Sequence, residues 1–104
     1  MKRGEIRWYK FNKPDKKRPI LILTRNSAIS YLNEITIAPI TSTIRHIPSE
    51  FILSKIDGMT RDCAINLDHI ETVSKAKIGS LITTLNNEQM SDVRKACCFG
   101  LGFD

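Results

Sequence analysis

The stretch Pro-Ile-Leu-Ile-Leu-Thr occupies positions 19–24 of a chain of 104 residues. Its apolar run is continuous and has the length of one strand, a pattern typical of a strand covered on both faces. We therefore expect it at the centre of a sheet. The preceding stretch 5–11 is rich in aromatic and β-branched residues and also predicts a strand. The polar residues 12–17 between the two predict a loop.

Short strands continue beyond this pair. Residues 26–33 predict a connection with one helical turn. Residues 35–41 predict the next strand, which must be irregular or at an edge near Pro39 because proline donates no ladder hydrogen bond. Asp57-Gly58 is a hairpin turn signal. Three further strands are predicted at 51–53, 63–67 and 70–73. Many short strands at close spacing indicate a small barrel or sandwich.

The last segment has helical periodicity. Asn86 and Gln89 form an approximate capping box, and Gly100 and Gly102 are stop signals. One face then carries, at spacings of three and four, Met90, Val93, Cys97 and Leu101. We predict a helix from 87 to 99 that packs on the barrel. Without internal repeats or linkers, residues 1–104 are expected to form a single, mainly β domain with a C-terminal helix.

The charge balance favours an anionic partner. Sixteen lysines and arginines against eleven acidic residues give a net charge of +5, which suits nucleic acid or a membrane surface. No apolar run approaches the roughly 20 residues that span a bilayer, so no membrane partner is expected. The odd set of three cysteines does not suggest a disulfide framework, and a cytoplasmic location is expected. The sequence has no CxxC pair, and His46 and His69 complete no metal-ligand spacing, so no metal or cofactor is expected.

Several stretches occur in a recognisable order along the chain. Lys2-Arg3-Gly4-Glu5-Ile6 is followed by Trp8 and Phe11, then by Arg18-Pro19-Ile20-Leu21-Ile22-Leu23, then by Ile37-Ala38-Pro39-Ile40-Thr41-Ser42. Residues 66–70, residues 77–79 and the terminal Gly-Leu-Gly come after them. In this order and spacing, over nearly the whole chain, the sequence resembles the MazF/PemK/Kid family of toxin endoribonucleases from type II toxin–antitoxin systems.

The resemblance implies both a fold and an activity. The fold is an SH3-like small β-barrel with a terminal helix (the CcdB/PemK-type plasmid toxin fold), assembled as a homodimer. The activity is sequence-specific cleavage of single-stranded RNA, neutralised by a cognate antitoxin whose disordered tail lies across the active groove. RNA carries its own nucleophile, the 2′-hydroxyl, so a metal-independent route is the consistent choice for a chain without a metal-ligand cluster.

Two residues match the catalytic positions of the family. Arg18 stands where the family has its catalytic arginine, and a guanidinium that stays charged suits stabilisation of a phosphorane-like transition state. Thr41 stands where the family has its catalytic threonine, whose hydroxyl can donate to a phosphate oxygen or hold the 2′-hydroxyl. By position alone, these would be a surface arginine that opens a strand and an ordinary strand threonine. Ser42 and Thr43 beside Thr41 are candidates for phosphate contacts.

Other residues are candidates for binding RNA. Lys13, Lys16 and Lys17 place positive charge just before Arg18, as a groove that follows a phosphate backbone requires. Trp8 can stack on a base, and strand alternation sends Trp8 and Tyr9 to opposite faces. His46 is a candidate substrate contact with a solvated loop residue as the alternative. His69, beside the apolar Ile70 in a strand-like segment, is interpreted as structural.

One departure and two alternatives remain open. Family members carry a longer, Gly-rich loop before the Arg-Pro pair, whereas residues 12–17 here are few and contain no glycine. The loop that gates RNA in the family therefore differs here in length and composition. The same fold also serves CcdB-like gyrase poisons, which use a C-terminal helix with an apolar tip. A non-catalytic SH3-like nucleic-acid-binding module is the second alternative.

Overall fold

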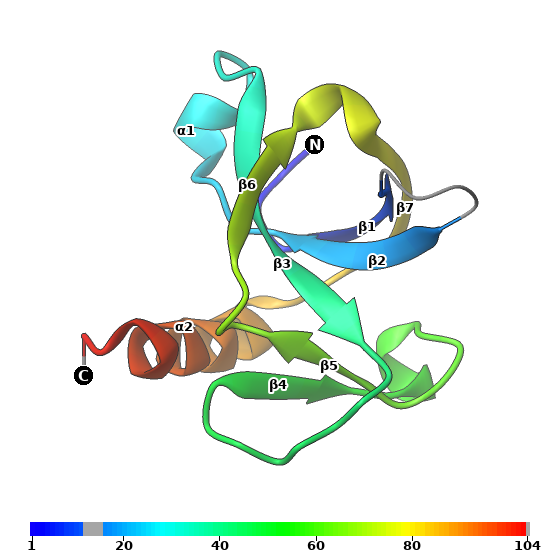
Figure 1. The fold of residues 1–104 in the computed structure, drawn as a ribbon, viewed down its shortest axis with the longest axis vertical. Helices are drawn as coiled ribbons and strands as arrows, with labels where there is room; N and C mark the ends of the chain where they lie inside the picture. Colours follow the sequence, from blue (N-terminus) through cyan, green and yellow to red (C-terminus); the bar gives the residue numbers. More distant parts are fainter. Residues whose placement is uncertain (12–15, 104) are drawn as a thin grey trace.

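The apolar run forms the end of strand β2 (Lys17–Ile22), which lies between β1 (Glu5–Lys10) and β3 (Glu34–Thr41) in an antiparallel sheet (Figure 1). The structure is a computed structural model that describes residues 1–11 and 16–103. Leu21 packs into one apolar cluster with Ile6 and Leu53, whereas Ile20 and Ile22 pack into another. The expected central strand with two covered faces is therefore confirmed.

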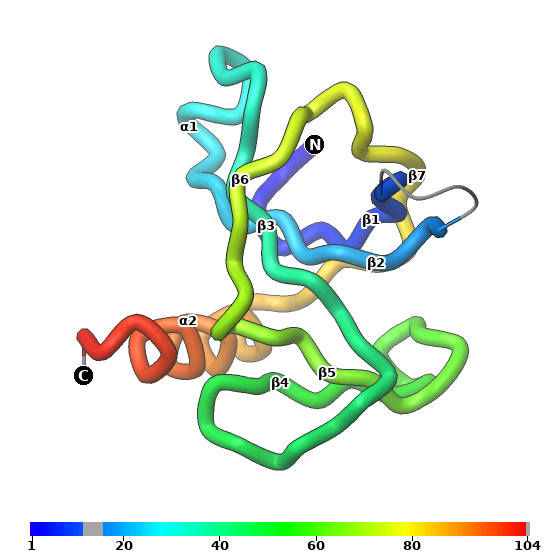
Figure 2. Tube along the Cα trace, viewed as in Figure 1, coloured from blue at the N-terminus to red at the C-terminus, as the bar shows by residue number. Residues whose placement is uncertain are grey.

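The remaining strands extend this sheet on both sides. They are β4 (Glu50–Leu53), β5 (Cys63–Asn66), β6 (Glu71–Ser74) and β7 (Ile78–Thr84). The strand order is β4-β5-β3-β2-β1-β7, with β6 also paired to β3. The sheet curls into a half-barrel; in Figure 2 α1 (Asn26–Ile29) lies beside the upper part of β3, and α2 (Asn87–Leu101) lies lower, next to β4 and β5. The predicted mainly β fold with a C-terminal helix is confirmed.

Strand β3 changes its partner near Pro39. On one side it pairs with β2 throughout residues 37–39. On the other side it pairs with β6 through residues 34–37 and then with β5 through residues 40–41 (Figure 1). Proline fits this position because the ladder on that side is interrupted there. The predicted irregularity is therefore present, but β3 is a central strand and not an edge strand.

Helix α2 begins as predicted and ends two residues later than predicted. The Asn86 side chain accepts a hydrogen bond from the Gln89 N–H at 2.7 Å, and the Gln89 side chain accepts one from the Asn86 N–H at 2.9 Å. Gly102 ends the helix in the left-handed region with φ of 77°. Val93 and Ala96 are the buried residues of the helix, whereas Leu101 is 50% exposed. The predicted apolar face is thus wrong at Leu101, which lies to one side of the helix face formed by Val93, Ala96 and Gly100.

Two other segments differ from the sequence-based expectation. Gly58 does not form a two-residue hairpin turn but ends a 3-10 helix, Lys55–Asp57, in the long connection between β4 and β5. Strand β7 was not expected, because Gly79 and Ser80 are poor strand formers and the strand contains no fully buried residue. It forms because it pairs with β1 along the sheet edge. None of the described helices is long and apolar enough to cross a membrane.

The central strand generates a prediction about stability. Leu21 is 0% exposed, so Leu21→Ala leaves a cavity and should lower the free energy of unfolding by about 2–5 kcal/mol. Leu101→Ala removes the same atoms from a half-exposed site and should cost about 1 kcal/mol or less. Denaturant unfolding at one fixed protein concentration measures both. An equal loss for the two variants would place Leu101 in the core, contrary to the structure.

The helix cap generates a second prediction. Asn86→Ala removes the side chain that accepts the Gln89 N–H, and should lower the free energy of unfolding by about 1 kcal/mol. Asn87→Ala, one residue further on at an exposed position, is the matched control and should change it by about 0.5 kcal/mol or less. Thermal and denaturant unfolding of the two variants make the comparison. A control as damaging as the cap variant would contradict the assignment of the cap to Asn86.

Candidate active site

Arg18 and Thr41 lie at neighbouring strand ends. β2 and β3 pair antiparallel with Ile20 opposite Pro39, and continuing this register by two residues brings Arg18 opposite Thr41. Both residues line a hollow of about 710 Å³, and both also line a second hollow of about 370 Å³. The strand register therefore places Arg18 beside Thr41. Because these two residues line both hollows, we call them the Arg18–Thr41 wall.

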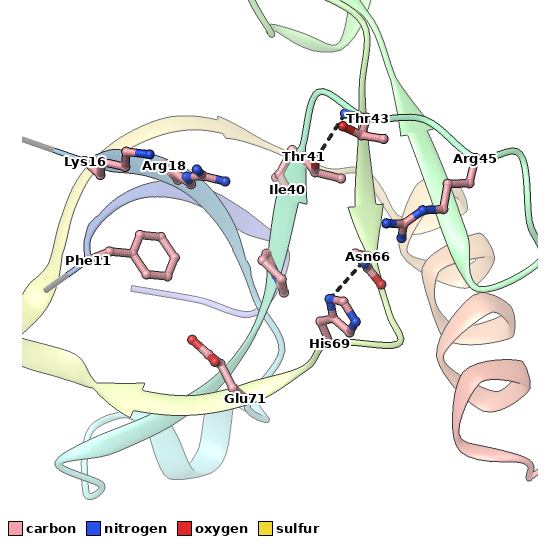
Figure 3. A pocket seen from close by; sticks show the side chains of 11 residues that line it. Phe11, Lys16, Arg18, Ile40, Thr41, Thr43, Arg45, Asn66, His69 and Glu71 are labelled. Atoms are coloured by element: carbon pink, nitrogen blue, oxygen red, sulfur yellow. Dashed lines mark hydrogen bonds between the residues drawn. The ribbon is translucent and has the colours of Figure 1, made fainter. Parts of the chain in front are cut away.

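The first hollow is predominantly basic (Figure 3). Its cations are Lys16, Arg18 and Arg45, against the single carboxylate of Glu71 among the described lining residues. In Figure 3 the Arg18 side chain extends toward Thr41, and the Arg45 guanidinium points toward Asn66. Three cations on one concave surface favour a polyanion, and a guanidinium can hold a phosphate through two parallel hydrogen bonds.

The hydroxyl of Thr41 is fixed by the chain just after it. Thr41 Oγ1 accepts a hydrogen bond from the Thr43 N–H at 3.1 Å. The hydroxyl hydrogen is not used in this contact, so it can still be donated to a ligand oxygen. The contact thus orients a donor next to the Arg18 guanidinium.

The second hollow is lined by side chains of a different kind. Trp8, Met59 and Ile82 give it apolar surface, and Lys17, Arg61 and Ser42 give it polar groups. Trp8 is 38% exposed whereas Tyr9 is 7% exposed, which confirms that the two rings face opposite sides of β1. A third hollow of about 610 Å³ continues from Trp8 and Lys17 to Lys10, Lys16 and Ser80. Aromatic surface between cations is suited to a nucleobase and its phosphates.

A tight polar turn, Asn66 to His69, closes the first hollow. The Asn66 Oδ1 accepts the Asp68 N–H at 2.9 Å, and the Asn66 Nδ2 lies 3.2 Å from the His69 Nδ1 (Figure 3). Ser49 Oγ donates to Asp68 Oδ2 at 2.6 Å, and the Leu67 N–H donates to the Ser49 carbonyl at 2.9 Å. These bonds fix the turn that carries His69, while the His69 ring remains exposed to the hollow.

The loop between β3 and β4 is fixed by Glu50. Its Oε1 accepts the N–H groups of Arg45 and His46 at 2.9 and 3.2 Å. His46 adopts φ of 56°, an uncommon conformation for a residue other than glycine. Arg45 thereby reaches the first hollow, whereas His46 lines none of the hollows described above.

The residues predicted from the sequence are distributed over these hollows. Lys16 and Thr43 line the first one and Trp8, Lys17 and Ser42 the second, with Arg18 and Thr41 in both. His46 lies in the loop beside them but outside both. Lys13 falls outside the residues that the structure describes.

Sequence reasoning missed several residues that line the hollows. They are Arg45, Asn66, His69 and Glu71 in the first hollow, and Met59 and Arg61 in the second. The expected place of His69 in a strand-like segment is wrong, because β5 ends at Asn66 and His69 lies exposed in the turn. The interpretation of His69 as structural stays a prediction. The polar pair Asp68-His69, inserted between apolar neighbours, was the available signal for a turn at that point.

Two other reactive groups nearby are held in their protonated forms. Burial, assisted by the charge of Glu71, raises the pKa of the Tyr9 hydroxyl. Burial, assisted by Asp62 and Asp57, raises the pKa of the Cys63 thiol, which makes it a weak nucleophile. Within residues 1–11 and 16–103 no three His, Cys, Asp or Glu side chains are grouped so as to hold a metal ion.

Comparisons with known proteins agree on one family. A model of the PemK-like, MazF-like toxins of type II toxin–antitoxin systems matches residues 2–99. The chain is 36% identical over 101 residues to the probable endoribonuclease MazF5 of Mycobacterium tuberculosis, covering 95% of this chain and 87% of that protein. It is 32% identical over 90 residues to the endoribonuclease MazF3 of the same species, covering 86% of this chain and 85% of that one.

Solved structures share the fold over nearly the whole length. The Mycobacterium tuberculosis toxin MazF-mt6 superposes with a TM-score of 0.87 at 28% identity, covering 96% of this chain and 98% of that one. A mycobacterial endoribonuclease solved in complex with its cognate antitoxin gives a TM-score of 0.87 at 23% identity, covering 100% and 97%, and supports the fold alone. Since the family model spans nearly all of the sequence and two relatives exceed 30% identity, this protein belongs to the PemK-like, MazF-like toxins of type II toxin–antitoxin systems.

Proposed function

We propose that this toxin is an endoribonuclease that cleaves single-stranded RNA at specific short sequences, without a metal, by attack of the 2′-hydroxyl on the adjacent phosphate. The observation that carries the proposal is the Arg18–Thr41 wall between two basic hollows. The family and the names of the relatives, both endoribonucleases, point to the same activity.

The reaction sets three requirements on the site. The O2′–P bond forms while the P–O5′ bond breaks, which leaves a 2′,3′-cyclic phosphate and a 5′-hydroxyl. The 2′-hydroxyl loses a proton, the leaving oxygen gains one, and negative charge develops on the phosphoryl oxygens. RNA supplies the nucleophile itself, so the protein contributes positioning, proton transfer and charge stabilisation.

Arg18 is assigned to charge stabilisation. An arginine side chain keeps its proton in proteins, so it is a poor acid but a permanent cation with a planar set of donors. At the shared wall it faces a phosphate placed between the hollows, with one nucleotide on each side. Thr41, whose hydroxyl is oriented by the Thr43 N–H, donates to the same phosphate or holds the 2′-hydroxyl.

The three connected hollows give a path for the flanking RNA. Lys16 and Lys17 are positioned to follow the phosphates, and Ser42 and Thr43 to add neutral contacts. The exposed Trp8 ring offers a stacking surface for a base. The different chemistry of the first and second hollows, one ionic and one partly apolar, supports discrimination between the bases on either side of the cut.

The biological setting follows from the family. We infer a cognate antitoxin that covers the basic hollows, a cytoplasmic location, a homodimer, and one toxin domain comprising residues 1–104. A gyrase poison on the same fold is the alternative with an observation in its favour, since Phe103, two residues beyond the end of α2, is 79% exposed. The relatives' names weigh against it, and they also weigh against a non-catalytic binding module.

The cleavage assay compares two arginine variants of equal charge. Arg18→Ala should lower the cleavage rate by about 10²–10³-fold, because it removes a donor from the developing charge. Arg94→Ala, on the exposed face of α2, should leave the rate unchanged. Purified protein is incubated with a long single-stranded RNA in EDTA, and the cut sites are mapped by primer extension.

The outcome separates the candidate functions. Discrete cuts by the wild type and by Arg94→Ala, with cyclic phosphate ends, support the endoribonuclease. Cleavage by Arg18→Ala at the wild-type rate would remove Arg18 from the chemistry. An absence of cleavage together with inhibition of gyrase supercoiling would replace the proposal with the gyrase alternative.

The oligomeric state is predicted separately. A domain of this size buries a modest core, and many such domains gain stability by association. Sedimentation equilibrium at micromolar concentration should give twice the chain mass of 11.8 kDa. A mass of one chain over that concentration range would refute the homodimer.

A further inference from the structure

The exposed ring of His69 lies on the same hollow as Arg18 and Thr41, yet none of the roles assigned above uses it. It stands at the end of the turn that follows β5, and the His69 N–H closes this turn onto the Asn66 carbonyl at 3.4 Å. Asn66, by contrast, is only 5% exposed. The buried Asn66 amide thus lies next to the exposed His69 imidazole.

The orientation of the Asn66 amide is determined by its other neighbour. The Asp68 N–H is a donor only, and the atom that it meets at 2.9 Å must therefore be the Asn66 oxygen. The reversed amide would place its NH₂ group against this N–H, donor against donor. The NH₂ group consequently faces the His69 ring, where it lies 3.2 Å from Nδ1.

This orientation decides which nitrogen of His69 carries hydrogen. The Asn66 NH₂ group can only donate, so Nδ1 accepts with its lone pair and holds no hydrogen. The single hydrogen of the neutral ring is then on Nε2, the nitrogen on the far side of the ring from Asn66. A ring in this tautomer has no free lone pair at Nε2, so that atom cannot accept the proton of the 2′-hydroxyl.

We propose that His69, held by Asn66 as the Nε2–H tautomer, donates a neutral hydrogen bond to a phosphoryl oxygen of RNA bound in the first hollow. The identity of the ligand in this proposal rests on the proposed function. The tautomer of His69 does not depend on that function. His69 is the contacting residue, and Asn66 is a positioning residue that acts through it.

The charges around the ring suit a neutral donor. Lys16, just before β2, and Arg18, within β2, line the hollow on one side. Arg45 lines it from the β3–β4 loop and Glu71 from β6, while Asp68 precedes His69 in the turn. Three cations already supply positive charge to a phosphate. A neutral N–H adds a directional contact without adding a fourth positive charge to repel the other three.

Nitrogen NMR tests the tautomer without any substrate. Imidazole ¹⁵N shifts distinguish a protonated ring nitrogen from an unprotonated one, and His46→Gln assigns the two histidines. At a pH where the ring is neutral, we expect His69 to carry hydrogen on Nε2 and none on Nδ1. Hydrogen on Nδ1, or a mixture of the two tautomers, would overturn the proposal.

Asn66→Asp reverses the direction of the contact. A carboxylate can still accept the Asp68 N–H, and it also accepts from the ring, so His69 should switch to the Nδ1–H tautomer. Retention of the Nε2–H tautomer in a folded Asn66→Asp protein would show that Asn66 does not position the ring. If this variant does not fold, the tautomer of His69 in the wild-type protein still tests the proposal.

Cleavage by two His69 variants tests the neutral-donor role. The Gln amide can present an N–H near the position of Nε2, so His69→Gln should keep cleavage within about 10-fold of the wild type. His69→Leu has no donor and should lose about 10²-fold or more. Equal losses in the two variants would indicate proton transfer by His69 and would overturn the neutral-donor role.

A non-cleavable oligonucleotide separates this proposal from the activity. The probe is single-stranded DNA, which has the phosphates of RNA but no 2′-hydroxyl. Its binding to the wild type should shift the His69 Nε2 resonance, and saturation without a shift would overturn the contact. Failure of the wild type to cut RNA would instead refute the proposed function while leaving the tautomer result intact.

Discussion

The interrupted ladder beside strand β3 is the constraint on which the rest of the structure depends. β3 keeps one neighbour, β2, through Pro39, while its other side passes from β6 to β5 with residues 38 and 39 paired to neither. Because β5 and β6 are consecutive in the chain, the segment that joins them must cross this gap. The turn from Asn66 to His69 therefore reaches the site through the topology of the sheet, although more than 20 residues separate it from Thr41.

The same constraint explains which parts of the site the sequence could predict. Arg18 and Thr41 flank strongly apolar strands, so their place at strand ends follows from local pattern, and the resemblance added their roles. His69 and Asn66 could not be placed in this way. Their proximity to Arg18 depends on how β3 divides its pairing between two strands, which is a long-range property. Arg45 likewise depends on a contact of its loop with Glu50.

The fold was predictable to a similar degree. The central strand, the irregularity at Pro39 and the helix start were all encoded locally, in an apolar run, a proline and a capping box. Strand β7 could not be predicted, because it is stabilised by its pairing with β1 more than by the strand propensity of its own residues. Leu101 followed the helical spacing, but the face that is buried passes through Val93, Ala96 and Gly100 and leaves Leu101 on its flank.

Helix α2 does more than pack on the sheet, because it also contacts a loop beside each of the two hollows. At its start, the Gln89 Nε2 donates to Asp57 Oδ1 at 2.8 Å, and Asp57 precedes the Gly58-Met59 edge of the second hollow. Toward its end, a Cβ added to Gly100 would lie 3.1 Å from both the Asp68 Oδ1 and the Leu67 carbonyl oxygen. The helix thus approaches the Asn66–His69 turn so closely that a larger residue at position 100 would require its neighbours to shift by a few tenths of an ångström. One element therefore contacts a loop of each hollow, so a change in the helix is expected to act on both hollows beside the Arg18–Thr41 wall.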